Sequence, residues 1–141
     1  DLAAYMEMDD TKLPTKKATI RTFFGCLAKG LEYLHMCGVR HKDIKPRNIL
    51  VHESRILLTD FGLSRVAGET GNNTTSGPTI MTRRYCAPEV GQYTSRNLSS
   101  DIWSLGCVYL ELLGQLVGWE SKFIESFLQS NGNHETAFWA N

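Results

Sequence analysis

One apolar segment, from Ile102 to Trp119, constrains the fold more than any other part of the chain, because so many apolar residues in succession have to leave water. A membrane span is one way to bury it. Glu111, Gln115 and three glycines interrupt the run, however, and its length is at the lower limit for spanning a bilayer. We therefore predict a buried central helix, with Ser99 and Ser100 as candidates for its N-cap.

A second long helix is predicted between Ala18 and Met36. Its apolar residues recur at steps of three and four positions, which is the period of an α-helix: Ile20, Phe24, Leu27, Leu31 and Leu34. Gly38 follows, and glycine is a common residue just beyond the end of a helix.

Shorter elements complete the expected α+β architecture. Two apolar runs, Ile49 to Val51 and Ile56 to Leu58, predict a small β-hairpin around His52 to Arg55. Residues 2–8 form a short amphipathic stretch, and residues 123–128 predict a short helix. Residues 68–78 hold no apolar side chain and predict a loop.

Composition narrows the class of protein without identifying it. Lysine plus arginine equals aspartate plus glutamate at 15 each, so we expect neither nucleic acid nor a membrane surface as a partner. The four cysteines show no Cys-x-x-Cys pair and no metal-ligand spacing, which favours reduced thiols. The first 17 residues lack the apolar core of a secretory signal. We therefore expect an intracellular protein, cytoplasmic or nuclear.

Four short motifs in a fixed order carry the chemistry. The first has the form His-x-Asp-x-Lys-x-x-Asn and fixes four positions, so a chance match in this length has odds of roughly one in a thousand. Any one of the other three would be weak support alone. The motifs are His41-Lys42-Asp43 with Lys45 and Asn48, Asp60-Phe61-Gly62, Ala87-Pro88-Glu89, and Asp101-x-Trp103-Ser104-x-Gly106.

Together these motifs make the chain resemble a eukaryotic Ser/Thr protein kinase. The resemblance is clear over residues 1–113 and weak over 114–141. It implies a protein-kinase-like α+β fold, of which residues 1–141 would be a partial domain. That part would be the mainly α-helical C-terminal lobe with its small β-hairpin, truncated at both ends. The Gly-rich loop and the lysine-bearing strand of the first lobe have no counterpart in the sequence.

The resemblance also implies a site for ATP and Mg²⁺. Asp43 matches the aspartate that orients the substrate hydroxyl and accepts its proton, and Lys45 matches the lysine that steadies the transferred phosphoryl group. Asn48 and Asp60 match the two Mg²⁺ ligands, in line with the preference of Mg²⁺ for hard oxygen donors.

Two further residues are implied to contact the nucleotide. Leu50 matches the apolar floor under adenine, and Asp1 matches the acidic residue that hydrogen-bonds the ribose. A lone Asp or Asn in a loop is more often a cap or turn residue than a catalyst, by roughly ten to one. The presence of all four motifs reverses those odds.

Other prominent residues receive structural roles from the resemblance. His41 and Phe61 are expected to belong to an internal hydrophobic column, and Asp101 to hydrogen-bond the backbone of the loop that carries the first motif. Trp103 is expected in the core, and Thr82 is expected to support the aspartate and lysine of the first motif.

Two departures from the family pattern bear on regulation and specificity. Lys42 stands where Arg is usual and lacks the fork that grips a phosphate, so activation by loop phosphorylation would be weakened. The hydroxyl-bearing residues of that loop have an equal alternative role as parts of a solvated loop that is not phosphorylated. Arg47 stands where kinases that prefer basic substrates carry Glu, so we expect no preference for basic residues upstream of the acceptor. In the chain's own loop, the candidate sites of activating phosphorylation are Thr74, Thr75, Ser76 and Thr79.

Two functions from different classes remain. The leading one is a fragment of a kinase whose parent enzyme phosphorylates Ser/Thr hydroxyls of protein substrates with Mg·ATP, the isolated chain being inactive. The alternative is a non-catalytic kinase-like binding or regulatory module, either a pseudokinase or a truncated product. The intact site residues count against a pseudokinase, and the missing first lobe counts for a non-catalytic product. Either function leaves room for a regulatory protein partner that the sequence does not identify.

Overall fold

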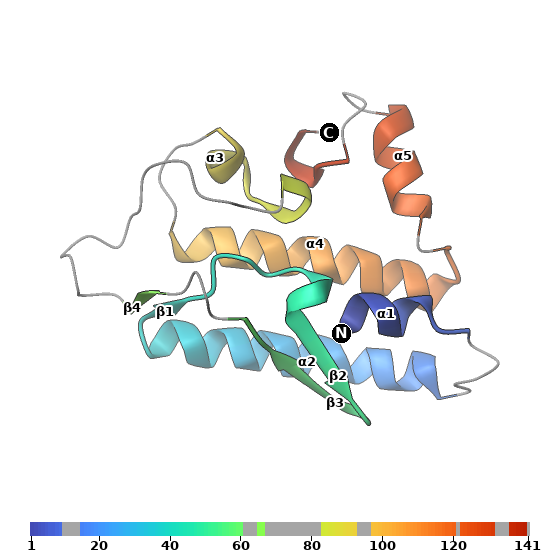
Figure 1. Ribbon diagram of the computed structural model, residues 1–141, viewed down its shortest axis with the longest axis horizontal. Helices are drawn as coiled ribbons and strands as arrows, with labels where there is room; N and C mark the ends of the chain where they lie inside the picture. The colour runs from blue at the N-terminus through green and yellow to red at the C-terminus, as the bar shows by residue number, and fades with distance from the viewer. Residues whose placement is uncertain are drawn as a thin grey trace.

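The computed structural model describes residues 1–9, 15–60, 65–66, 83–92, 97–120, 122–131 and 136–140. The long helix α4 (Leu98–Val117) runs through the middle of the molecule (Figure 1). On one side of it lie α1 (Leu2–Glu7), α2 (Lys16–Met36) and a β-hairpin. On the other side lie the short helix α3 (Pro88–Gly91), α5 (Phe123–Asn131) and the 3₁₀ turn η4 (Phe138–Ala140). The expected α+β architecture is confirmed.

The two long helices form where the sequence predicts them, with one difference in capping. Helix α2 ends at Met36, and Gly38 follows with a φ of 72°, a left-handed conformation that suits glycine. The N-cap of α4 is Asn97 rather than Ser99 or Ser100, so that prediction is wrong. Asn97 accepts a hydrogen bond from the Ser99 N–H, and the Ser100 hydroxyl accepts one from the Asn97 N–H. Ser100 therefore contributes to the cap from inside the first turn.

The predicted hairpin is confirmed as an antiparallel pair of strands, β2 (Ile49–His52) and β3 (Arg55–Leu58). Ile49 pairs with Leu58, so the residues just outside the strands meet at the open end of the hairpin. The Thr59 N–H donates to the Asn48 carbonyl there at 2.9 Å. Asn48 and Asp60, two residues predicted for one site, are thereby brought to the same end of the same hairpin. A second pair, β1 (Val39–Arg40) with β4 (Arg65–Val66), is also antiparallel.

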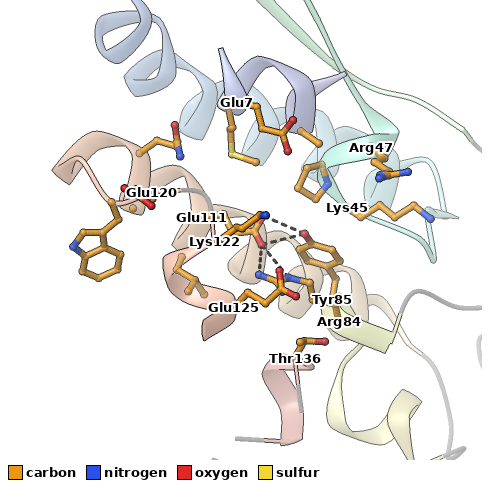
Figure 2. Close-up of a pocket in the computed structure, with 17 residues that line it drawn as sticks. Glu7, Lys45, Arg47, Arg84, Tyr85, Glu111, Glu120, Lys122, Glu125 and Thr136 are labelled. Atoms are coloured by element: carbon orange, nitrogen blue, oxygen red, sulfur yellow. Dashed lines mark hydrogen bonds and ion pairs between the residues drawn. The ribbon is translucent and has the colours of Figure 1, made fainter. Parts of the chain in front are cut away.

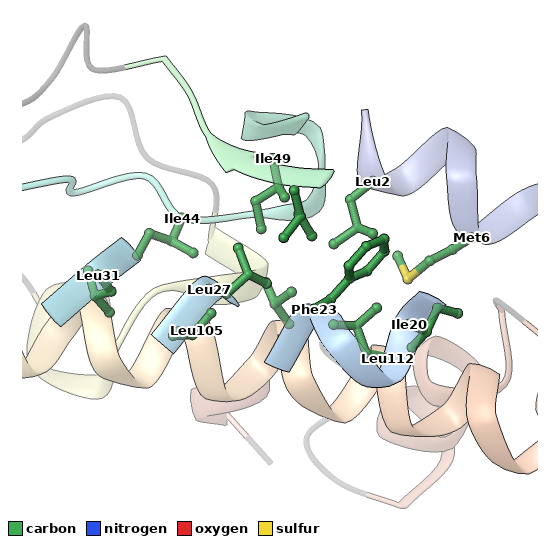
Figure 3. Close-up of a cluster of buried hydrophobic side chains, with 12 residues drawn as sticks. Leu2, Met6, Ile20, Phe23, Leu27, Leu31, Ile44, Ile49, Leu105 and Leu112 are labelled. Atoms are coloured by element: carbon green, nitrogen blue, oxygen red, sulfur yellow. The ribbon is translucent and has the colours of Figure 1, made fainter. Parts of the chain in front are cut away.

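The core lies between α2 and α4, and α1 and the hairpin close it from above (Figure 3). Fully burying a side chain such as Leu or Phe contributes about 1.5–3 kcal/mol, so this cluster is the main source of stability in the described part. Its central members are Phe23, Leu27, Ile44, Ile49, Val108 and Leu112.

A buried lysine fastens α1 to the start of α2. The Lys16 side chain is 3% exposed, and its Nζ donates to the carbonyls of Met6 at 2.9 Å and Met8 at 2.6 Å. These carbonyls lie at the C-terminal end of α1, where the backbone lacks intrahelical partners and a cation is favoured.

Helix α4 leaves one side of its surface exposed in the described part of the chain. Leu105, Val108 and Leu112 point into the core, whereas Ile102 is 59% exposed and Trp103 is 38% exposed. The prediction that Trp103 belongs to the core is therefore wrong, because more than a third of its side chain is exposed. None of the helices in the described residues has the length and hydrophobicity needed to cross a membrane.

Candidate functional site

The loop that carries the first motif is anchored from α4 by Asp101, as the sequence predicts. The Asp101 carboxylate is 2% exposed and accepts the backbone N–H of His41 at 2.9 Å and of Lys42 at 2.8 Å. The Nε2 of His35, on α2, lies 3.1 Å from the same carboxylate. Hydrogen bonds to an ionised acceptor are roughly twice as strong as neutral ones, so Asp101 fixes the loop against both long helices.

Two residues of the predicted site region hold the backbone in an unfavourable conformation. Lys42 has a φ of 70° and Asp60 has a φ of 63°, both in the left-handed region that non-glycine residues rarely adopt. Such a conformation costs on the order of 1–3 kcal/mol and persists only where the surroundings impose it. For Lys42, the hydrogen bond from its own N–H to Asp101 supplies that constraint.

Three of the predicted site residues converge within the loop. The Nζ of Lys45 lies 2.6 Å from Oδ2 of Asp43. The Nδ2 of Asn48 donates to the same oxygen and to the Asp43 carbonyl, both at 2.9 Å. Asp43 and Lys45 are partly buried, with side chains 16% and 21% exposed. A carboxylate held by two donors at a surface that solvent and substrate can reach is suited to orient a hydroxyl group.

His41 is fully buried and engaged on both ring nitrogens. Its Nε2 donates to the Thr59 carbonyl at 2.8 Å, and its Nδ1 accepts the Asp43 N–H at 3.4 Å. This pairing describes a neutral imidazole that carries its proton on Nε2. A ring fixed in this way ties the loop to the hairpin and does not serve as a general base. Its expected partner in the hydrophobic column, Phe61, lies outside the described residues.

Asn48 and Asp60 have the chemistry that a magnesium ion requires. Because Nδ2 of Asn48 is turned to Asp43, its other amide atom, Oδ1, is left as an oxygen donor for a cation. Asp60 stands one residue beyond Thr59, which is hydrogen-bonded to the Asn48 carbonyl. Among the described residues, no group of three or more His, Cys, Asp or Glu side chains could hold a metal ion. An amide oxygen and a carboxylate oxygen at the open end of the hairpin fit the preference of Mg²⁺ for hard oxygen donors.

The two residues expected at the nucleotide lie on the surface. Leu50 is 43% exposed and pairs across the hairpin with Leu57, which is 54% exposed. Directly paired side chains share one face, so the hairpin presents an apolar patch that suits a flat ring. Asp1 caps α1 by accepting the Ala4 N–H at 2.9 Å, a structural role that the sequence interpretation missed. Contact of Leu50 with adenine and of Asp1 with ribose stays a prediction.

A cavity of about 590 Å³ adjoins this loop (Figure 2). Lys45 and Arg47 line it from the loop, and α1, the end of α4 and the start of α5 form its other walls. The 3₁₀ turn η3 (Arg83–Tyr85) contributes Arg84 and Tyr85.

A partly buried charge cluster forms one wall of the cavity. Arg84 donates to Oε1 of Glu111 from Nε at 3.2 Å and from Nη2 at 3.0 Å. The Tyr85 hydroxyl lies 3.1 Å from both carboxylate oxygens of Glu111, and Nη1 of Arg84 lies 3.6 Å from Glu125. Sequence reasoning missed this cluster, because Glu111 and Glu125 lie more than twenty residues from Arg84 and Tyr85.

Burial sets the ionisation of these groups. It raises the pKa of Glu111, and the Arg84 guanidinium opposes that rise. Burial and the Glu111 charge raise the pKa of Tyr85 well above its ordinary value, so the phenol keeps its proton and donates it. Burial likewise raises the pKa of the nearby Cys107 thiol to about 12.

The third motif is tied to α4 by serines. The Ser100 hydroxyl donates to Glu89 at 2.7 Å, and Ser104 donates to the Tyr85 carbonyl at 2.9 Å. These bonds hold the segment from 83 to 91 against the same helix that anchors the first motif. The predicted role of Thr82 and the candidate loop acceptors Thr74, Thr75, Ser76 and Thr79 lie outside the described residues.

Comparison with known proteins agrees with the motifs. The protein kinase domain family matches residues 1–137. The chain is 37% identical to Serine/threonine-protein kinase NLK2 of Xenopus laevis over 77% of its own length and 25% of that protein. It is 37% identical to Mitogen-activated protein kinase kinase kinase ANP1 of Arabidopsis thaliana over 79% of its own length and 17% of that protein. It is 44% identical to Stress-activated protein kinase JNK of Suberites domuncula over 60% of its own length and 23% of that protein. The chain thus spans a quarter or less of the length of these curated relatives.

Proposed function

The chain belongs to the protein kinase domain family, and from that premise we propose that the protein containing it transfers the γ-phosphoryl group of Mg·ATP to Ser and Thr hydroxyls of protein substrates. The observation that carries this proposal is the arrangement around Asp43. Its carboxylate is held by Lys45 and Asn48 on a loop anchored by Asp101, the arrangement required to orient a nucleophile.

In the proposed reaction, Asp43 accepts a hydrogen bond from the substrate hydroxyl and takes its proton as the oxygen attacks the γ-phosphorus. The bond from that phosphorus to the oxygen bridging it to the β-phosphate breaks, and ADP leaves with the bonding electrons. The ammonium of Lys45, next to that carboxylate, then stabilises the negative charge that develops on the transferred phosphoryl oxygens. Asn48 links the two sides of the site, because its amide nitrogen fixes Asp43 while its amide oxygen remains for the metal.

The Mg²⁺ ions and ATP would be held by Asn48 and Asp60, with Leu50 under the adenine and Asp1 at the ribose. When bound, the metal neutralises charge on the phosphate oxygens. The chain's own contribution is to present an amide and a carboxylate oxygen from the open end of the hairpin.

The substrate preference proposed from Arg47 is an absence of selection for basic residues upstream of the acceptor. Arg47 is exposed and lines the cavity beside Lys45. A cation at this position repels a cationic substrate side chain.

We place the protein in the cytoplasm or nucleus, a proposal supported by the four free cysteines.

The test uses the full-length protein with γ-labelled ATP, Mg²⁺ and a mixed protein substrate. Label on Ser and Thr supports the proposal. ATP binding without transfer would contradict it and favour the non-catalytic binding module. The isolated chain of 141 residues is expected to transfer little or no phosphate, because its sequence contains no Gly-rich loop to cover the phosphates. Robust turnover by the isolated chain would overturn that expectation.

A further inference from the structure

The charged cavity next to Lys45 is positioned to receive part of a protein substrate. Lys45 lines it and lies 2.6 Å from Asp43, the residue proposed to orient the substrate hydroxyl. A substrate segment that presents its Ser or Thr to Asp43 therefore places a neighbouring side chain in this cavity. The inference below rests on the proposed function in this respect.

The charges at the rim of the cavity balance. The partly buried charge cluster of Arg84, Tyr85, Glu111 and Glu125 therefore decides which substrate side chain the cavity prefers. Arg47 and Lys122 are exposed cations at the rim, and Glu7 and Glu120 are exposed anions. Exposed charges are screened by solvent and salt, and these four cancel in number. The Glu111 side chain, by contrast, is only 10% exposed, so its interactions are screened far less.

Arg84 occupies a site that has every feature of a cation-binding site. Its guanidinium contacts the carboxylates of Glu111 and Glu125. The same group lies 5.9 Å from the ring centre of Tyr85 and 5.5 Å from that of Phe138, distances at which an aromatic ring attracts a cation. Two carboxylates and two rings would also attract an arginine or lysine side chain from a substrate.

We infer that Arg84 fills this cation site from within the chain and thereby excludes substrates that carry Arg or Lys at the position entering the cavity. An incoming cation has to displace Arg84 or lie beside it, and like charges in a poorly screened wall repel. Arg84 is thus a specificity-determining residue. Its removal opens the site, because Glu111 and Glu125 then lack the cation that both of them contact.

The experiment replaces Arg84 by glutamine in the full-length protein and measures kcat/KM on a positional library of Ser/Thr peptides. Each position around the acceptor carries arginine or citrulline, the uncharged analogue of arginine. We expect Arg84→Gln to raise the arginine-to-citrulline ratio at one position by about tenfold or more, as is typical when a charge pair is made or removed. The neighbouring exposed residue supplies the matched control, and Arg83→Gln should leave the ratio unchanged.

A double variant identifies the carboxylate responsible. Adding Glu111→Gln to Arg84→Gln should return the ratio to the wild-type value, because the buried charge is then gone. Should Arg84→Gln fail to fold, Arg84→Lys provides the second variant. It keeps a cation but loses the two-pronged contact, so we expect a shift of about threefold in the same direction. An unchanged ratio in the folded variant, or an equal gain for arginine and citrulline, would overturn the inference.

Direct binding separates this inference from the proposed function. The affinity of a labelled Ser peptide with one arginine is measured by fluorescence anisotropy against its citrulline twin. If the Arg84→Gln variant binds the arginine peptide more tightly while the wild type transfers no phosphate, the proposed function is contradicted and the cation site is supported. If the wild type transfers phosphate but Arg84→Gln changes neither the affinity for the arginine peptide nor the arginine-to-citrulline ratio, only the cation site is contradicted.

Discussion

The hydrogen bonds from Asp101 to the loop yield a prediction whose size can be worked out. Asp101→Asn keeps the shape of the side chain but leaves one carbonyl oxygen where two carboxylate oxygens accepted two backbone N–H groups. Of the His41 and Lys42 N–H groups, one then faces the amide NH₂ and has no acceptor. The other keeps a neutral carbonyl acceptor in place of the ionised one. An unsatisfied buried donor costs about 1–3 kcal/mol and the loss of charge assistance about 1 kcal/mol, giving about 2–4 kcal/mol for the loop.

Amide hydrogen exchange of the segment containing His41 and Lys42 measures this directly in the full-length protein. A loss of about 2–4 kcal/mol corresponds to exchange that is roughly 30- to 1000-fold faster. We also expect kcat to fall at least about tenfold, because the same loop carries Asp43. Glu32→Gln removes an exposed carboxylate, 55% exposed, and is the matched control that should leave exchange unchanged. Exchange within a factor of about three of wild type in Asp101→Asn would refute the anchoring role.

Further predictions concern stability and reactivity. Lys16→Met should destabilise the protein by about 1–3 kcal/mol in urea unfolding, because two carbonyls of α1 lose their charged donor. Gly91→Ala should destabilise it and change the tryptophan fluorescence, because the new Cβ would lie 2.5 Å from the Trp139 ring; an unchanged spectrum and stability contradict that contact. Cys107, with its pKa raised to about 12, should resist iodoacetamide in the folded protein at about pH 8, while exposed cysteines react. Burial raises the folded-state pKa of Glu111, so the stability that its protonated form contributes is lost as pH rises through that pKa. The Glu111→Gln variant has no such proton to lose, so its free energy of unfolding should fall less than that of the wild type between about pH 4 and pH 7.

Local chemistry explains what the sequence predicts well. The two long helices, the hairpin and the grouping of Asp43, Lys45 and Asn48 all arise within short stretches of chain, where periodicity and motif spacing are informative. The bond from Asp101 to a loop sixty residues away was predicted only because a family resemblance supplied it.

Contacts between distant segments explain what the sequence interpretation missed. Arg84 and Glu111 are 27 residues apart and carry no pattern that pairs them. Trp103 is expected in the core from the family resemblance, yet its side chain is 38% exposed. Asp1 was assigned to a ligand, but a short polar side chain in front of a helix also satisfies the requirements of a cap.

The most direct test of the central claim is the turnover of Asp43→Asn in the full-length protein, measured beside its affinity for Mg·ATP. Asparagine keeps the size of Asp43 but cannot take a proton from the substrate hydroxyl. We predict that kcat falls by about 10²–10⁴-fold while the affinity for Mg·ATP changes by less than about threefold. Turnover within about tenfold of wild type would show that Asp43 does not carry the proposed reaction.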